Sequence, residues 1–306
     1  MLDQIIKRLL FLVPILLGVV FVTFIIIHAI PGNPAEVILG LDATPENIVK
    51  LEKKMGLDKS LATQYVIYVK QLLKGDLGYS YRTERTVFRE IRTRYPNTIS
   101  LAIVAFIFML VLGGIAGVFC ALKQNSKTDF ILRGISVLGI SLPEFWSGFL
   151  FILLFSVYLR WFPSEGKHGI LSFILPAFTL SLSGVGMTTR LVRSSLLEIL
   201  QQPYIRAARA KGVSQSMVVI RHALKNAMIP AITIMGFQLG RFLGGAVVVE
   251  TVFNWPGMGR LAIEAILGRD IPMVQATILI LALTYVVINL ITDLVYVVLD
   301  PRIRYH

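Results

Sequence analysis

Long apolar stretches alternate with short polar ones along most of this chain. Because a bilayer core is crossed by about 20 mostly apolar helical residues, the pattern predicts six membrane-spanning helices, over 9–30, 98–122, 134–159, 170–189, 226–249 and 273–299. The third range contains Pro143 and Glu144, which predict a kink or a split near its cytoplasmic end. The sequence therefore predicts an all-α integral membrane protein.

The stretch between the first two spans, residues 31–97, has the spacing of amphipathic helices. Thr44 followed by Pro45 marks a helix start. A second helix is expected over 61–73. Residues 86–95 predict an interfacial helix that leads into the second span and whose apolar side carries Val87, Phe88 and Ile91. We expect a folded external loop, which is either a cap over the outer face or a docking surface for an external partner.

Basic residues in the short loops predict the orientation of the chain. With the N-terminus inside, the cytoplasmic loops hold most of them, including seven between Arg190 and Lys225. Residues 31–97 are discounted because they form a long loop that also contains eight acidic residues. Both termini are thus expected in the cytoplasm. The first span is interpreted as a retained anchor, since its apolar run is too long for a signal peptide.

Composition agrees with a membrane protein and excludes several other classes. Hydrophobic residues make up 55% and charged residues 16% of the chain. The net charge of +12 comes mainly from residues flanking apolar runs, so nucleic-acid binding is not expected. The single cysteine, Cys120, excludes an internal disulfide framework. No catalytic motif or metal-ligand spacing is present, so we expect neither an enzyme nor a metal site.

Glycines and charges inside the spans suggest packing faces and a polar path. Glycines four residues apart allow a neighbouring helix to approach closely, as at Gly113 and Gly117 and again at Gly236, Gly240 and Gly244. Arg241 lies near the middle of the fifth span, where it either forms an internal pair or lines a polar translocation path. Glu250 and Asp293, nearer the ends of their spans, are expected to face headgroups or loops.

The segment 201–230 contains five basic residues and no acidic one. Tyr204 to Lys211 predicts a helix that Gly212 interrupts, and Ser214 predicts the cap of a second helix. On that second helix, the apolar face is expected to contain Val213, Met217, Ile220 and Leu224. The result is a cytoplasmic helical hairpin with a small-residue knob at Ala207 and Ala208. Its partner is either anionic lipid or a protein socket.

One stretch of this hairpin resembles the docking-loop signature of permease subunits in ABC importers, E-A-A-x-x-x-G: Arg206-Ala207-Ala208-Arg209-Ala210-Lys211-Gly212. Arg206 replaces the glutamate, and only Leu224 matches the usual I-x-L-P tail. These departures resemble the dipeptide/oligopeptide/nickel branch of the family. Further matching motifs extend over nearly the whole chain: Pro31-Gly32-Asn33-Pro34, Gly75-Asp76-Leu77-Gly78, Pro143-Glu144-Phe145-Trp146, Glu250 to Arg260 and Asp300-Pro301-Arg302-Ile303-Arg304.

The resemblance implies a type I ABC importer permease fold with four parts. These are an N-terminal transmembrane helix (1–30), an external helical loop (31–97), a five-helix permease core (98–299) with a cytoplasmic coupling hairpin (196–225), and a cytoplasmic tail (300–306). The residues implied to dock on an ATPase are Tyr204, Ile205, Arg206, Ala207, Ala208, Arg209, Lys211 and Gly212.

The implied partners are a second homologous permease, two cytoplasmic ATPases, an external substrate-binding protein and the lipid bilayer. ATP and Mg²⁺ would bind to the ATPases, and this chain would bind no cofactor. The implied location is the cytoplasmic (inner) membrane of a bacterium or archaeon. Dipeptides or oligopeptides are the leading substrates, with glutathione, nickel or nickel chelates as alternatives. A secondary carrier or a channel that works without ATPases is the alternative of another class.

Overall fold

The computed structural model describes residues 2–29 and 31–299, with side chains except those of 2–11, 229–235, 245 and 293–299. The described chain is almost entirely helical, with one two-stranded sheet. It divides into two compact units. The first contains Met1–Thr98 and Pro256–Thr284, and the second contains Ile99–Trp255 and Tyr285–His306. Two long helices, α5 (Val87–Phe108) and α14 (Ile271–Leu299), contribute residues to both units.

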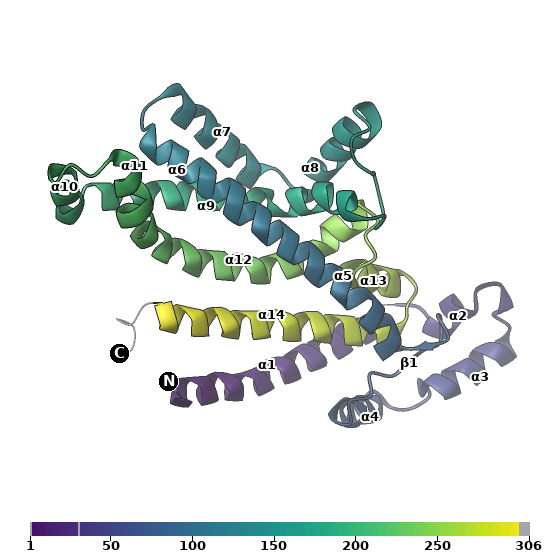
Figure 1. The fold of residues 1–306 in the computed structure, drawn as a ribbon. Coiled ribbons are helices and arrows are strands. Elements are labelled where there is room, and N and C mark those ends of the chain that lie inside the picture. Colours follow the sequence, from purple (N-terminus) through teal and green to yellow (C-terminus); the bar gives the residue numbers. More distant parts are fainter. Residues whose placement is uncertain (1, 30, 300–306) are drawn as a thin grey trace. The chain divides into compact units, whose positions relative to one another are not determined.

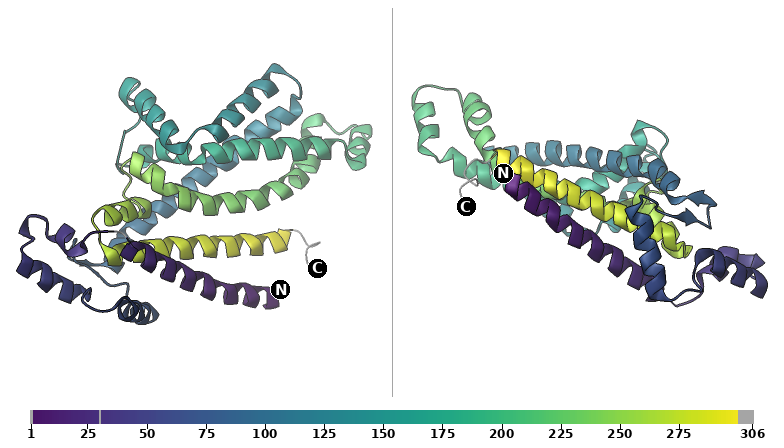
Figure 2. Two further views of the ribbon diagram at one scale, coloured as in Figure 1. Left: turned by 180° about the vertical axis from the view of Figure 1, so that it is seen from behind. Right: turned by 90° about the horizontal axis from the view of Figure 1, so that it is seen from below.

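The first unit contains the first span, the external loop and the segment before the last span. Its α1 lies alongside the first half of α14 (Figures 1 and 2). Between α1 and α5 the chain forms three short helices and a hairpin that pairs Tyr79 with Thr86. The elements of this unit other than α5 and α14 are α1 (Leu2–Ala29), α2 (Pro34–Leu39), a 3-10 turn (Gly40–Asp42), α3 (Pro45–Met55), α4 (Leu61–Leu73), β1 (Tyr79–Ser80), β2 (Arg85–Thr86) and α13 (Met258–Leu267).

Local signals explain why the external helices begin and end where they do. Thr44 Oγ1 accepts a hydrogen bond from the backbone N–H of Asn47 at 3.3 Å, so α3 begins at the predicted cap. Ser60 caps α4 in the same way, and α4 covers the predicted range 61–73. Gly56, with φ of 72°, ends α3 in the left-handed conformation that suits glycine. The sequence predictions for these two helices are therefore confirmed.

The helix predicted over 86–95, leading into the second span, is present, but its apolar face was predicted wrongly. Residues from Val87 onward are the start of α5, which continues into the second span without a break. Val87 and Ile91 are buried in a cluster with α13 and α14, whereas Phe88 is 59% exposed. Adjacent helical residues are about 100° apart around the axis, so Phe88 points away from the face that Val87 and Ile91 share.

The second unit is built around α9 (Ile174–Leu200), which contacts α6, α7, α8 and α12. Its apolar core includes Leu101, Leu180, Phe242 and Trp255. The other elements of this unit are π-helical turns at Met109–Gly113, Ile152–Tyr158 and Val218–Ala223, a 3-10 turn at Ile170–Phe173, α6 (Gly114–Leu122), α7 (Lys127–Ser141), α8 (Glu144–Phe151), α10 (Pro203–Ala210), α11 (Gln215–Met217) and α12 (Leu224–Val252).

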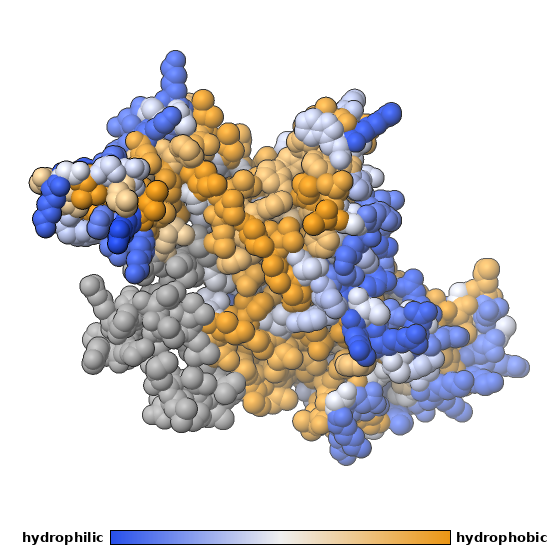
Figure 3. Space-filling model, viewed as in Figure 1, coloured by the Kyte–Doolittle hydropathy of each residue, from blue (hydrophilic) through white to orange (hydrophobic). Residues whose placement is uncertain are grey.

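Glycines bring α9 close to its neighbours. A side chain at Gly113 would meet Thr188, and one at Gly117 would meet Val192 at 2.7 Å, so both positions require glycine for the π-helical turn Met109–Gly113 and α6 to contact α9. The glycine spacing in the second span therefore serves packing inside this chain. Hydrophobic residues colour the surface over α6 and α7, while hydrophilic ones gather at the turn between them and over α10 (Figure 3).

Among the described residues, four helices are long and apolar enough to cross a membrane, or five if one bent pair is counted as a span. The four cover Leu12–Ala29, Val87–Leu122, Ile170–Leu200 and Ile271–Thr292. The fifth expected span falls on α12, whose 29 residues extend about 44 Å. Several of its side chains lie outside the described residues.

The third span is the bent pair, and its expected limits were wrong. Its first half, α7, begins at Lys127 rather than near residue 134, and α7 and the following helix meet at 113°. Pro143 explains the break, because it lacks an N–H and forces Leu142 into an extended conformation with ψ of 129°. The break therefore lies in the middle of the pair, not near its cytoplasmic end.

Candidate functional site: the basic hairpin and the charges of the spans

The basic hairpin begins with a short helix, α10, directly after α9. Pro203 occupies its first turn, where a missing N–H costs nothing, and the Arg- and Ala-rich sequence favours a helix. The chain turns at Gly212, whose φ of 79° lies in the left-handed region. The predicted helix over 204–211 and the predicted interruption thus coincide with α10 and its turn.

Ile205 anchors α10 to the rest of the second unit. Its side chain is fully buried in an apolar cluster with residues at the ends of α6 and α9 and near the start of α12: Ala121, Leu196, Val218, Ala223 and Ala227. Burying a side chain of this size contributes roughly 1.5–3 kcal/mol. The preceding residue, Tyr204, accepts a hydrogen bond through its Oη from Asn226 Nδ2 at 2.9 Å. These contacts hold a helix of eight residues that would be marginal alone.

The second helix of the hairpin differs from the prediction. The residues after Gly212 do not form a separate second helix. Instead α11, the π-helical turn Val218–Ala223 and α12 follow one another directly. Ser214 occupies the cap position but makes no capping hydrogen bond. Met217 and Ile220 are exposed, and Val218 and Val219 are buried instead. A π turn shifts the register of the faces, which a 3.6-residue period cannot anticipate.

The outer surface of α10 is basic. Arg206, Ala207, Arg209 and Lys211 are exposed, and Ala208 is half-buried toward the apolar cluster. Of the two alanines expected to form a knob, only Ala207 projects outward. The surface therefore combines a small side chain with three positive charges, a pattern that suits either an acidic protein cleft or anionic headgroups.

A buried ion pair that the sequence analysis missed ties the turn between α6 and α7 to α9. The carboxylate of Asp129 is fully buried and accepts hydrogen bonds from Arg193 Nε and Nη2, both at 2.9 Å. Asp129 also accepts the N–H of Asn125 at 3.0 Å and lies 3.2 Å from Arg133 Nε. In the sequence, Ser126-Lys127-Thr128-Asp129 looks like an ordinary helix cap. Only the long-range partner Arg193 shows that Asp129 belongs to a buried ion pair.

Charges at membrane depth form a second group. Arg241 is exposed in this chain and donates a hydrogen bond to Gln238 Oε1 at 3.3 Å, and Gln238 itself is 1% exposed. Glu144, at the break before α8, is close enough to be attracted by the charge of Arg241. Glu250 is fully buried, so its side chain does not face lipid headgroups. Its backbone carbonyl accepts a hydrogen bond from the N–H of Trp255, in the turn that follows α12, at 2.8 Å. The side chain of Asp293 lies outside the described residues.

The glycines of the fifth span do not share one contact. Gly236 approaches Thr292, and Gly240 approaches Tyr285 and Asn289, all on the second half of α14. Gly244 faces open space. Gly236 and Gly240 therefore lie in a contact between α12 and α14, whereas Gly244 lies outside that contact.

In the first unit, polar contacts fix the external loop to the α13–α14 turn. Ser80 Oγ donates a hydrogen bond to the buried carboxylate of Asp270, and Arg82 donates to the carbonyl of Glu264 at 2.7 Å. Burial raises the pKa of Asp270, although the bond from Ser80 opposes the shift. Burial also raises the pKa of Tyr68 on α4 well above its ordinary range. No group of three or more potential metal ligands occurs among the described residues.

The fold defines the class of the protein. A solved structure of the inward-facing MetNI methionine ABC transporter matches with a TM-score of 0.61 and 18% identity, over 70% of this chain and 97% of that chain. An amino acid ABC transporter matches with a TM-score of 0.52 and 15% identity, over 68% of this chain and 94% of that one. The fold is therefore that of type I ABC importer permeases.

Two family models identify the family within this class. The model of the binding-protein-dependent transport system inner membrane component matches residues 113–305, and the model of the N-terminal part of such membrane components matches residues 1–102. The dipeptide transport system permease protein of Alkalihalophilus pseudofirmus is 41% identical over the whole length of both chains. The glutathione transport system permease protein of Escherichia coli (strain K12) is also 41% identical over both whole chains. The chain belongs to the binding-protein-dependent transport permease family: it is a multi-pass membrane permease of an ABC importer, not an enzyme.

Proposed function

We propose that this chain is one of two homologous permease subunits of an importer for short peptides, with dipeptides as the leading substrates. The full-length similarity to a dipeptide permease, at 41% identity, is the observation that supports this most directly. The equal similarity to a glutathione permease supports glutathione as the alternative. Glutathione is itself a short peptide, so both substrates present carboxylates and an ammonium group to the path. Nickel or nickel chelates are a further alternative within the same importer class.

The path for such a substrate runs past Arg241. An ionisable side chain at membrane depth is costly and by default marks a functional site. Arg241 is exposed on α12 with the opposite charge of Glu144 nearby. A guanidinium suits a peptide carboxylate and a carboxylate suits a peptide ammonium. These two residues give the path a polar lining of both signs.

Coupling to ATP hydrolysis runs through α10. Two cytoplasmic ATPases bind ATP and Mg²⁺, and their closure moves α10 as a rigid lever, because Ile205 holds it to the cluster at the ends of α6 and α9. An external substrate-binding protein delivers the peptide, and this chain binds no cofactor. The importer resides in the cytoplasmic membrane of a bacterium or archaeon, with both termini in the cytoplasm, including the tail 300–306, which lies outside the described residues.

Transport by the reconstituted importer tests the substrate. Proteoliposomes containing all subunits and the cognate binding protein are supplied with labelled dipeptide, labelled glutathione or nickel. We expect ATP-dependent dipeptide uptake that exceeds nickel uptake at least about tenfold. Preferential uptake of glutathione or nickel would replace the leading substrate with that alternative. Uptake without ATP or without the ATPase subunits would instead favour a carrier or a channel.

Two substitutions at Gly212 test the coupling lever. A side chain at this position meets no other atom of this chain, so within the permease the effect of a substitution comes from the backbone. Gly212→Val forces a β-branched residue into φ of 79°, while Gly212→Asn keeps a residue that tolerates this region. We expect the valine variant to lose ATPase attachment or substrate-stimulated hydrolysis, and the asparagine variant to retain both, at matched abundance. Equal behaviour of the two variants would contradict the lever.

A bulky residue on the exposed face tests docking itself. Ala207→Trp is expected to weaken ATPase attachment about tenfold, since an overpacked interface costs about 1–3 kcal/mol. Ser216→Trp, also exposed but beyond the turn, is the matched control. If α10 instead rests on lipid, Ala207→Trp leaves attachment intact, and joint replacement of Arg206, Arg209 and Lys211 by glutamine releases the segment from anionic vesicles.

A further inference from the structure

A polar cavity in the first unit is lined by α4 and the first turns of α14. The α3–α4 turn and the β1–β2 hairpin complete its wall, and its volume is about 550 Å³. Small-ligand pockets usually measure roughly 300–1,000 Å³. The proposed peptide path lies on α8 and α12, in the second unit, and uses none of these residues. The cavity therefore needs its own explanation.

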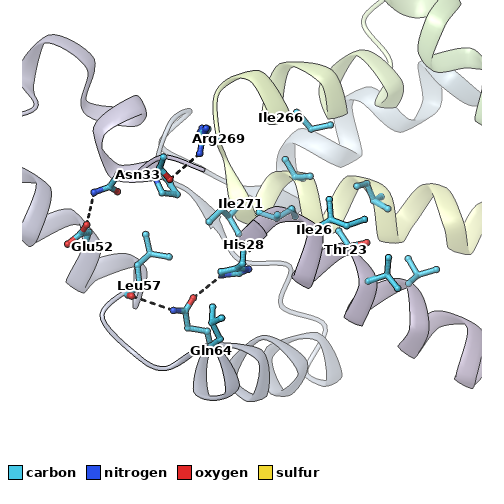
Figure 4. Close-up of a pocket in the computed structure, with 18 of the residues that line it drawn as sticks. Thr23, Ile26, His28, Asn33, Glu52, Leu57, Gln64, Ile266, Arg269 and Ile271 are labelled. Atoms are coloured by element: carbon cyan, nitrogen blue, oxygen red, sulfur yellow. Dashed lines mark hydrogen bonds between the residues drawn. The ribbon is translucent and has the colours of Figure 1, made fainter. Parts of the chain in front are cut away.

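Two glutamine side chains line this cavity from opposite elements, and they differ in their hydrogen bonds. On α4, the amide nitrogen of Gln64 donates to the carbonyls of Leu57 and Lys59. Its oxygen lies 3.0 Å from His28 Nε2 (Figure 4). Gln275, on α14, is 5% exposed and lines the same cavity, but its amide forms no hydrogen bond within the described part of the chain. A buried amide without a partner is costly, so Gln275 points to a ligand with hydrogen-bonding groups of its own.

Tyr68 adds an unpaired hydroxyl to the same cavity. It lies one turn after Gln64, so both side chains are on one face of α4. Its hydroxyl makes no hydrogen bond with any residue that the structure describes. Burial raises the pKa of Tyr68, so the hydroxyl keeps its proton at neutral pH and can donate it to an acceptor. The cavity therefore offers free hydrogen-bonding groups from both α4 and α14.

The lysines and the carboxylate of the cavity favour an anionic ligand. Lys53, Lys54 and Lys59 bring three positive charges from the end of α3 and the turn after it, against the one carboxylate of Asp76. None of the three lysines forms an ion pair among residues 2–29 and 31–299. All three are exposed, so their charge attracts an anion toward the cavity rather than holding it in one fixed pair.

We infer that this cavity binds a short peptide with a free C-terminal carboxylate. A peptide group donates to the oxygen of the Gln275 amide and accepts from its nitrogen. Phosphate only accepts hydrogen bonds and would leave that oxygen unpaired, and an uncharged sugar would leave the lysines without an anion. An apolar side chain of the peptide packs on Ile67, Leu77 and Pro272. The inference rests on the proposed function, since it assigns a second place where the imported class of substrate binds.

A photoreactive dipeptide tests the site. The importer is purified without its binding protein and irradiated with alanyl-benzoylphenylalanine, and the labelled residues are mapped by mass spectrometry. We expect label on the cavity wall that alanyl-phenylalanine displaces about tenfold better than its C-terminal amide, which lacks the carboxylate. Joint replacement of Lys53, Lys54 and Lys59 by glutamine should remove this difference. Label confined to α8 and α12, or equal displacement by both dipeptides in the wild type, would overturn the inference.

Gln275→Met separates binding from folding. Methionine fills a similar volume without a polar group, so the thermal stability of the peptide-free importer should stay unchanged or rise. Its affinity for alanyl-phenylalanine should fall about tenfold, because the bound peptide loses a buried partner. Gln124→Met, which replaces an exposed amide in the turn between α6 and α7, is the matched control and should keep the wild-type affinity. Wild-type affinity in Gln275→Met, with or without a loss of stability, would assign the amide a structural role and contradict the site.

Three further outcomes separate this inference from the proposed function and from a protein ligand. Dipeptide uptake without label in the first unit would overturn the inference and leave the proposed function intact. Label on the cavity of an importer that takes up no dipeptide would support the site and contradict the proposed function. Displacement of the label by the peptide-free binding protein, but not by alanyl-phenylalanine, would assign the cavity to a segment of that protein and show the inference to be wrong.

Discussion

Replacing Asp129 by asparagine removes the charge that holds the turn between α6 and α7 against α9. The carboxylate is fully buried, and it accepts both donors of the Arg193 guanidinium fork at 2.9 Å. Asparagine keeps the size and one acceptor oxygen, but it leaves Arg193 without its counter-charge. The variant therefore isolates the electrostatic contribution of the pair from its packing.

The size of the effect follows from the exposure of the partners. Removing one member of a fully buried ion pair costs about 3–5 kcal/mol. The side chain of Arg193 is 19% exposed and that of Arg133 is 46% exposed, so water compensates part of the loss. We therefore expect the turn to become about 2 kcal/mol easier to open, which is about a 30-fold change in the opening equilibrium. Arg193→Met should cost more, because it leaves the buried carboxylate with only the exposed Arg133.

Hydrogen exchange measures this opening directly. The N–H of Asn125 donates to Asp129 Oδ2 at 3.0 Å, so its exchange rate reports on the turn. In Asp129→Asn we expect this amide to exchange about 30-fold faster. The double variant Asp129→Asn/Arg193→Met should exchange more slowly than the two single effects predict together. Glu198→Gln is the control, because it removes an exposed charge from α9, the helix that carries Arg193. Exchange of Asp129→Asn within about threefold of that control would refute the reasoning.

Two further predictions concern helix contacts and orientation. Gly117→Val should lower the abundance of the folded protein, because its new Cβ would lie 2.7 Å from Val192, whereas Gly114→Val meets no atom and should be tolerated. Immunoblots of membrane fractions compare the two, and equal abundance would show that α6 and α9 can separate without cost. In a Cys120→Ala background, an impermeant thiol reagent applied outside intact cells should label Thr63→Cys but not Ser214→Cys, both of which replace exposed residues. Labelling at position 214 from outside would reverse the orientation.

The external helices show what local sequence could predict. Thr44 caps α3 and the range 61–73 is α4, because caps, turn glycines and apolar spacing act within a few residues of one another. The existence of the long apolar helices was predictable for the same reason. Cluster partners were not predictable: α13 has no strong start signal, and Ile205 gains its anchoring role only where α6, α9 and α12 meet.

In the basic hairpin, too, some features follow from the local sequence and others from the tertiary structure. The composition of 204–211 and the glycine at 212 determined α10 and its turn, since both depend on local backbone preferences. The face of the following segment was decided by tertiary structure, because a π turn moved Val218 and Val219 into the core in place of Met217 and Ile220. The pairing of Asp129 with Arg193, 64 residues apart, and the burial of Glu250 also arose only in the folded chain. Partners distant in sequence are brought together by packing, and no local period records them.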